Sequence, residues 1–262
     1  MPQATQVESF SKPLDPPVRG FLHRPQSPNG NALILTHGAG GNAQAPLLIA
    51  LAETFCARGF TVLRANLPFR QTRSFGPPGP ADAARDRAGL KNAVTCVKGI
   101  VAAPPWSRLV RQPGDFDFDA NPSAAECQPI EQNSAGRIFL AGHSYGGRQS
   151  SILCSEEPDL ATGLLLFSYP LHPPRKPEQQ RTQHLPDLHT PTLFVHGTRD
   201  PFGTIEELQK AIKMIPAHTR LLPVEGEGHD LGYKGKSRPQ PLMTTTTAAF
   251  GEFFPDLPTE VP

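Results

Sequence analysis

Short apolar runs recur along the chain and alternate with stretches in which apolar side chains return every three or four residues. The runs are typical of strands buried on both faces, and they lie at 32–36, 60–63, 138–141, 164–167 and 192–195. The helix-spaced stretches lie at 46–58, 82–100, from 145 onward, at 204–215 and at 240–254. Strands that alternate with helices at this spacing predict an α/β domain with a mostly parallel sheet.

Other segments complete this layout. Residues 4–10 and 17–23 are predicted to form two edge strands, and 220–224 a further strand. Prolines and glycines interrupt 66–80, and prolines interrupt 170–190, which predicts that neither segment is regular structure. Residues 103–136 have no sustained period, and a loop of this length is either functional or disordered. We therefore expect a single domain over residues 1–262, with 103–136 as an irregular insertion.

The chain is organised around the sequence Gly142-His143-Ser144-Tyr145-Gly146, a G-x-S-x-G motif between a predicted strand and a predicted helix. In a nucleophile elbow the serine occupies a turn that is too tight for side chains on its flanks, so glycines stand two residues away on each side. A serine in an ordinary glycine-rich loop would give the same pentapeptide. The strand before it, the helix after it and a third glycine, Gly147, favour the elbow.

A nucleophilic serine needs a base, and the base needs an acid to orient it. In an open parallel sheet these groups collect at the carboxyl ends of strands. His229 follows the strand at 220–224 in a glycine-rich loop, whereas His218 precedes that strand. Asp200 follows the strand at 192–195, although Pro201 and Gly203 would also suit a turn or helix-cap role for it. Chain order and sheet edge favour Ser144, Asp200 and His229 as the catalytic residues.

The glycine-rich loop after the strand at 32–36 supplies the remaining part of such a site. The backbone N–H groups of Ala39 and Tyr145 are the expected oxyanion hole, with Gly40 as the alternative to Ala39. A phosphate-binding loop is disfavoured because the segment has neither a G-K-[ST] nor a G-x-G-x-x-G motif. His37 is expected to form structural hydrogen bonds.

Composition limits the partners. With 25 Lys and Arg against 24 Asp and Glu, the charge is balanced, which gives no indication of nucleic acid as a partner. The N-terminus shows no basic and apolar signal segment, and no apolar run reaches the length of a membrane span. We therefore expect a cytoplasmic protein with no membrane span. The nucleophile and oxyanion hole described above predict a small acyl substrate as its partner.

The motifs at 36–41, 142–148, 196–203 and 226–231, which read THGAGG, GHSYGGR, HGTRDPFG and GEGHDL, resemble the α/β-hydrolase superfamily over nearly the whole chain. The segments LPFRQTR and TRDPFG look like the dienelactone-hydrolase-like group that contains testis-expressed protein 30 and the third subunit of the NSL chromatin complex. The resemblance implies an eight-stranded, mostly parallel sheet flanked by helices on both faces, without a separate cap domain. It also maps the superfamily's nucleophile, acid and base onto Ser144, Asp200 and His229.

Two functions follow from this pattern. The first is a serine hydrolase that works through an acyl-enzyme on carboxylic esters or thioesters, with no cofactor and no metal. The alternative is a non-catalytic interaction or scaffold protein of the same fold, because some members of that group look like interaction subunits. A scaffold gains nothing from retaining nucleophile, base, acid and oxyanion hole together, which favours the enzyme.

Arginines and loops near the site suggest substrate preferences. Arg70 and Arg73 lie beside the expected catalytic edge, and Arg148 opposes the dipole of the helix it begins, which together suggest an anionic substrate. Solvated or salt-bridged arginines would give the same pattern. Residues 170–190 leave the carboxyl end of a strand and are expected to roof the pocket. Residues 103–136 precede a strand and are expected at the opposite edge.

Overall fold

The computed structural model describes residues 6–102, 136–233 and 240–255. Its strands are β1 (Gln6–Lys12), β2 (Val18–Arg24), β3 (Ala32–Thr36), β4 (Thr61–Asn66), β5 (Ile138–His143), β6 (Gly163–Phe167), β7 (Thr192–Gly197) and β8 (Thr219–Val224). Its helices are α1 (Pro46–Cys56), α2 (Pro68–Thr72), α3 (Asp82–Ala102), α4 (Tyr145–Glu156), α5 (Ile205–Ile212) and α6 (Gln240–Phe253), and η2 (Leu185–Asp187) is a 3-10 turn.

The strands form one sheet of eight in the order β1-β2-β4-β3-β5-β6-β7-β8. From β4 to β8 every neighbouring pair is parallel, whereas β1 with β2 and β2 with β4 are antiparallel. The predicted α/β-hydrolase architecture is confirmed. One detail is wrong: β2 is not an edge strand, because it pairs with β1 on one side and with β4 on the other.

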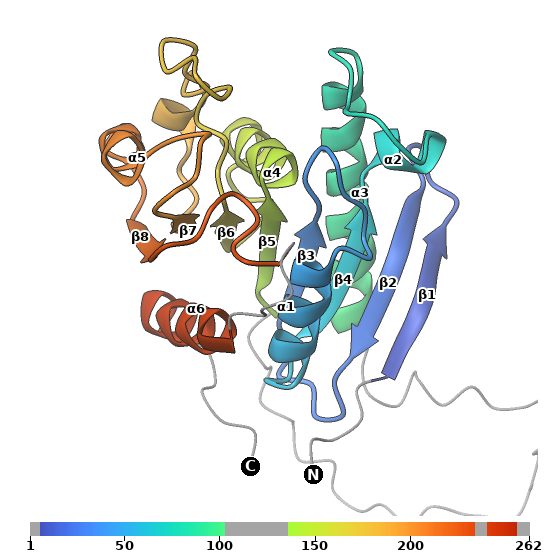
Figure 1. The fold of residues 1–262 in the computed structure, drawn as a ribbon. Coiled ribbons are helices and arrows are strands. Elements are labelled where there is room, and N and C mark those ends of the chain that lie inside the picture. The colour runs from blue at the N-terminus through green and yellow to red at the C-terminus, as the bar shows by residue number, and fades with distance from the viewer. Residues whose placement is uncertain (1–5, 103–135, 234–239, 256–262) are drawn as a thin grey trace, which may run out of the picture.

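Helices cover both faces of the sheet (Figure 1). Helices α1 and α6 pack on one face, while α3, α4 and α5 pack on the other, and each face has its own apolar core. All residues of β3, β6 and β7 are buried. Burial on both faces explains why these strands are continuous apolar runs rather than alternating patterns. Between β6 and β7 the chain holds only the turn η2, so no separate cap domain is inserted there.

The expectation that residues 66–80 lack regular structure is wrong in part. β4 continues to Asn66, and residues 68–72 form α2. Pro68 occupies the start of this helix, where its fixed φ suits the first turn and its missing N–H costs no hydrogen bond. Residues 73–81 contain no helix or strand, as predicted.

The expected insertion at 103–136 lies, except for Gly136, outside the described residues. The prediction of one continuous domain with an irregular insertion therefore stays a prediction. The elements on either side are described: α3 ends at Ala102, and β5 begins at Ile138 at the amino edge of the sheet.

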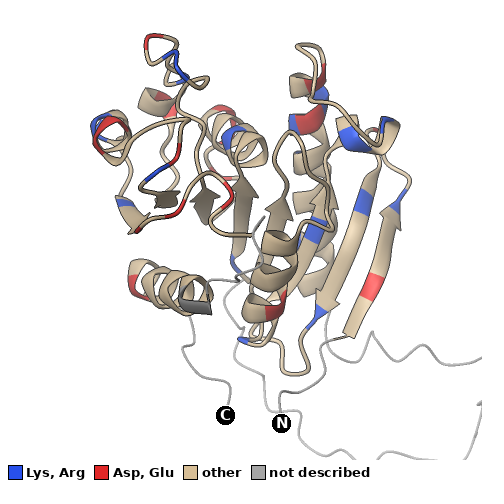
Figure 2. Cartoon of the chain, viewed as in Figure 1, with Lys and Arg blue, Asp and Glu red and all other residues tan. Residues whose placement is uncertain are grey.

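Acidic and basic residues are interspersed over the elements seen in Figure 2. One basic group is buried on β4, where the Arg64 Nε–H donates to His23 Nε2 at 2.8 Å. Arg64 and His23 are only 5% and 1% exposed. Burial, and secondarily the charge of Arg64, lowers the pKa of His23 from 6.5 to about 4. The folded state therefore holds His23 neutral, because its acceptor nitrogen is already used.

This pair predicts acid sensitivity of the fold. The folded pKa of His23, about 4, lies below the unfolded value of 6.5, so unfolding takes up a proton between these pH values. The free energy of unfolding should fall as pH drops from 6.5 towards 4. His23→Gln keeps an acceptor but does not titrate, so its pH slope, measured by urea denaturation, should be shallower by up to about one proton. An unchanged slope would contradict the account.

Candidate active site

Ser144 lies in a strained turn between β5 and α4. Its φ of 53° and ψ of −118° place it in a region that non-glycine residues rarely adopt. The flanking glycines permit this turn: a Cβ on Gly142 would lie 2.4 Å from the Gly147 nitrogen, and one on Gly146 would lie 2.6 Å from the His37 oxygen. The geometry matches the tight strand-turn-helix predicted from the motif.

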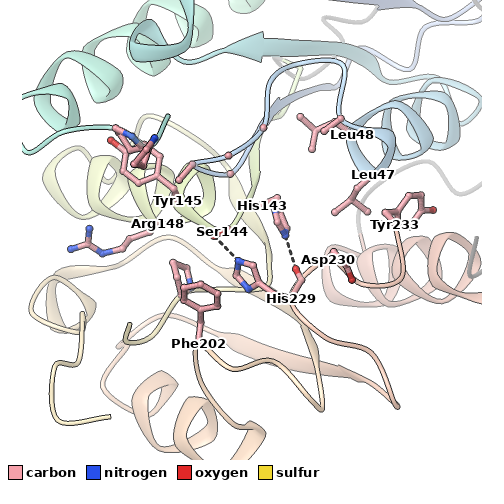
Figure 3. A pocket seen from close by; sticks show the side chains of 18 of the residues that line it. Leu47, Leu48, His143, Ser144, Tyr145, Arg148, Phe202, His229, Asp230 and Tyr233 are labelled. Carbon is pink, nitrogen blue, oxygen red and sulfur yellow. Dashed lines mark hydrogen bonds between the residues drawn. The ribbon is translucent and has the colours of Figure 1, made fainter. Parts of the chain in front are cut away.

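A chain of hydrogen bonds runs from Ser144 to Asp200 through His229. Ser144 Oγ lies 2.8 Å from His229 Nε2, and His229 Nδ1 lies 2.8 and 3.0 Å from the two carboxylate oxygens of Asp200. Because a carboxylate accepts, Nδ1 carries the imidazole proton, and Nε2 is left to accept from the serine hydroxyl. Figure 3 shows this imidazole facing Ser144. The structure thus brings all three predicted residues together.

Asp200 is held by its own loop. Its side chain is fully buried, and the Phe202 N–H donates to its Oδ1 at 2.9 Å. His196 Nε2 donates to the Gly203 carbonyl at 2.8 Å and lies 3.7 Å from Asp200 Oδ2. Burial lowers the pKa of His196, which favours its neutral form. The carboxylate therefore has two fixed polar neighbours besides His229.

Two further residues hold His229, and sequence reasoning missed both. The His143 Nε2–H donates to the His229 carbonyl at 2.7 Å. The Phe202 ring lies 4.1 Å from the imidazole at an angle of 33°. An aromatic face so close can stabilise an imidazolium. The available signals were the histidine next to Ser144 in the motif and the phenylalanine two residues after Asp200.

His37 fixes the first peptide groups of the loop at 37–41. His37 Nδ1–H donates to the Gly38 carbonyl at 2.8 Å, and His37 Nε2 accepts from the Leu67 N–H at 3.1 Å. Burial is the main cause that lowers the pKa of His37 to about 4, so the ring is neutral, in the structural role expected for it. Because a trans peptide points C=O and N–H in opposite directions, this contact fixes the direction of the Ala39 N–H.

Arg70 fixes the next peptides of the loop. Its guanidinium donates to the carbonyls of Ala39 at 2.7 Å, Gly41 at 2.9 Å and Gly76 at 2.8 Å. The contact with Ala39 orients the Gly40 N–H by the same peptide geometry. The sequence contained this arginine but gave no indication that backbone carbonyls would satisfy it.

Tyr145 is anchored by Asp86, an acidic residue of α3. Its hydroxyl donates to Asp86 Oδ2 at 2.7 Å, and the Phe69 N–H donates to Asp86 Oδ1 at 2.9 Å. Burial raises the pKa of Asp86 and also that of Tyr145. Asp86 shares the buried stripe of α3 with Leu90 and Val94, which was the signal by which the sequence could have revealed it.

A cavity of about 590 Å³ opens over Ser144. Its lining includes several predicted site residues, Ala39, Gly40, Ser144, Tyr145, Arg148 and His229. It also includes Pro170 and Arg181 from the segment that was expected to roof the pocket.

Arg70 and Arg73 do not line this cavity. The first is 8% exposed and engaged with carbonyls, and the second forms an ion pair with Asp82. Among the described residues no group of three His, Cys, Asp or Glu side chains is placed to hold a metal ion, and no helix is long and apolar enough to cross a bilayer.

Comparison with known proteins shows the family of this chain. Residues 111–250, more than half of the chain, match the family model described as "Alpha/beta hydrolase domain". The chain therefore belongs to the α/β hydrolase family. The finer resemblance to the group of testis-expressed protein 30 stays a prediction.

Solved structures share the fold. A dienelactone hydrolase from Anabaena variabilis is 16% identical, with a TM-score of 0.65 over 97% of this chain and 98% of that chain. A lidless α/β serine hydrolase from Xanthomonas campestris is 14% identical, with a TM-score of 0.63 over 100% and 99% of the two chains. An esterase from Pyrococcus furiosus is 15% identical, with a TM-score of 0.65 over 97% and 92%. At these identities the likeness concerns the fold alone.

The contacts of Arg70 predict a structural role for this residue. Arg70→Ala leaves four backbone carbonyls, those of Ala39, Gly41, Arg73 and Gly76, without their charged donor. We expect it to lower the free energy of unfolding by about 2–4 kcal/mol. Arg73→Ala is the matched control, because loss of its exposed ion pair should cost about 1 kcal/mol or less. Denaturant unfolding measures both. Equal small effects would mean that Arg70 does not hold the loop.

Proposed function

We propose that this protein is a serine hydrolase that cleaves carboxylic esters or thioesters through an acyl-enzyme. The observation that carries the proposal is the continuous hydrogen-bond chain from Ser144 through His229 to buried Asp200. The strained backbone of Ser144 supports it. Strained residues persist only where the surrounding structure holds them, and they cluster at active sites.

In the first half-reaction Ser144 Oγ attacks the substrate carbonyl carbon while His229 Nε2 takes the hydroxyl proton. Asp200 keeps the imidazole oriented and stabilises its protonated form. The imidazolium then gives the proton to the departing alkoxide or thiolate as the carbon–oxygen or carbon–sulfur bond breaks. Water repeats the sequence on the acyl-enzyme, releases the acid and restores Ser144.

The oxyanion of each tetrahedral intermediate needs donors that are fixed before the reaction. We assign this role to the backbone N–H groups of Ala39 and Tyr145, with Gly40 as the alternative to Ala39. Tyr145 is the first residue of α4, where a backbone N–H has no partner within the helix. The anchors at Arg70, His37 and Asp86 would then serve catalysis by holding these groups still.

Esters and thioesters are favoured over amides as substrates, because alkoxides and thiolates leave more readily than amines. The dienelactone hydrolase and the esterase of the same fold act on substrates in keeping with this class. The reaction as proposed uses no cofactor and no metal. A cytoplasmic location and the absence of a nucleic-acid partner remain predictions from the sequence.

The proposal predicts a specific loss of turnover. On a panel of 4-nitrophenyl esters and acyl-CoA thioesters, Ser144→Ala should lower kcat by at least about 1,000-fold, and Asp200→Asn by about 1,000- to 10,000-fold. Ser155→Ala, on α4 outside the cavity lining, is the matched control and should retain wild-type activity. Hydrolysis at the wild-type rate by Ser144→Ala would refute Ser144 as the nucleophile, and no hydrolysis by any form would favour the scaffold.

A further inference from the structure

The cavity has two chemically different ends. Leu47, Leu48 and Tyr233 form one end, and Arg148 and Arg181 contribute to its lining elsewhere. Figure 3 shows Arg148 on one side of Ser144 and Leu47, Leu48 and Tyr233 on the other. Asp230 also lines the cavity, but it lies beside Tyr233, across His229 from Arg148. Substrate bound at Ser144 is thus placed between an apolar end and a cationic end.

The two arginines lack a counter-charge in the protein. Within the part of the chain that the structure describes, neither forms an ion pair with a carboxylate, and the buried Nε of Arg148 has no hydrogen-bond partner. The Arg181 side chain makes one long contact, to the Pro170 carbonyl at 3.4 Å. Both arginines line the same cavity, and burial, with the charge of Arg148 as a second cause, lowers the pKa of Arg181.

The protein holds this unfavourable arrangement in place. The Arg181 N–H donates to the Leu171 carbonyl at 2.8 Å, and the Tyr169 hydroxyl donates to the Arg181 carbonyl at 3.1 Å. Arg148 is fixed in the first turns of α4, where its charge also opposes the helix dipole. Half-buried cations without a carboxylate partner cost free energy, and an anionic ligand group would offset that cost.

We propose that Arg148 and Arg181 bind a carboxylate of the substrate, so that the preferred esters or thioesters carry a free carboxylate on one side of the scissile bond. The inference rests on the proposed function and specifies its substrate class. Arg148 follows Ser144 by four residues, near the start of α4, and both residues line the same cavity. A carboxylate several bonds from the scissile carbonyl can span the separation between the two residues.

Paired substrates that differ in a free carboxylate and its methyl ester test the proposal. For a carboxylate on the acyl side the pair is 4-nitrophenyl hydrogen adipate and 4-nitrophenyl methyl adipate. For a carboxylate on the leaving group it is 4-carboxyphenyl butanoate and its methyl ester. Wild-type enzyme should prefer the charged member of at least one pair, and the pair concerned identifies the side. Equal or lower kcat/KM for the charged member of both pairs would overturn the proposal.

Variants then assign the preference to the arginines. Arg148→Gln and Arg181→Gln should each lower kcat/KM for the preferred charged substrate about 10- to 100-fold, mainly through KM, and change its neutral partner less than about threefold. Arg148→Lys keeps the charge and should recover part of the loss. Arg175→Gln removes an exposed arginine of the same segment outside the cavity and is the matched control.

The outcomes separate this proposal from the proposed function. Equal losses on charged and neutral substrates in folded Gln variants would overturn the carboxylate site, while Ser144-dependent hydrolysis of the neutral esters would leave the hydrolase intact. If Ser144→Ala hydrolyses both members of each pair like the wild type, the proposed function is refuted, and the carboxylate site that rests on it is refuted with it.

Discussion

The tight contact between the end of β5 and the start of α4 is the constraint on which the site depends. Glycines at 142, 146 and 147 let helix and strand approach within a distance that a single Cβ would block. Ser144 is forced into a backbone conformation that costs about 1–3 kcal/mol in isolation. The cost is tolerated because the sheet on one side and the helix on the other leave the turn no alternative.

Around this turn, buried polar side chains hold backbone carbonyls and the Tyr145 side chain in fixed positions. His37 and Arg70 hold the carbonyls of the 37–41 loop, Asp86 holds Tyr145, and His143 holds the carbonyl of His229. These contacts join segments that are far apart in the sequence. Their common effect is to fix donors and acceptors before substrate binds, which is the condition for electrostatic stabilisation of a transition state.

Much of this could be predicted from the sequence because its causes are local. Strand runs follow from burial on both faces, the elbow from its glycines, and the positions of Asp200 and His229 near Ser144 from chain order and strand ends. The sequence carried signals for Asp86 and Phe202 as residues of interest, but their contacts, and those of Arg181, could not be predicted because they depend on which side chains meet across the folded molecule. Arg70 illustrates the limit: its position near the site was correct, but only the fold shows that its guanidinium faces carbonyls rather than the cavity.

The central claim is that the strained turn makes Ser144 a nucleophile activated by His229. Intact-protein mass spectrometry after treatment with a fluorophosphonate tests this most directly. The account predicts one adduct, on Ser144, that is absent in Ser144→Ala, slow to form in His229→Ala and unchanged in Ser168→Ala, a buried serine with a similar φ of 48° at the end of the next strand. An unlabelled wild-type protein, or an adduct that persists in Ser144→Ala, would contradict it.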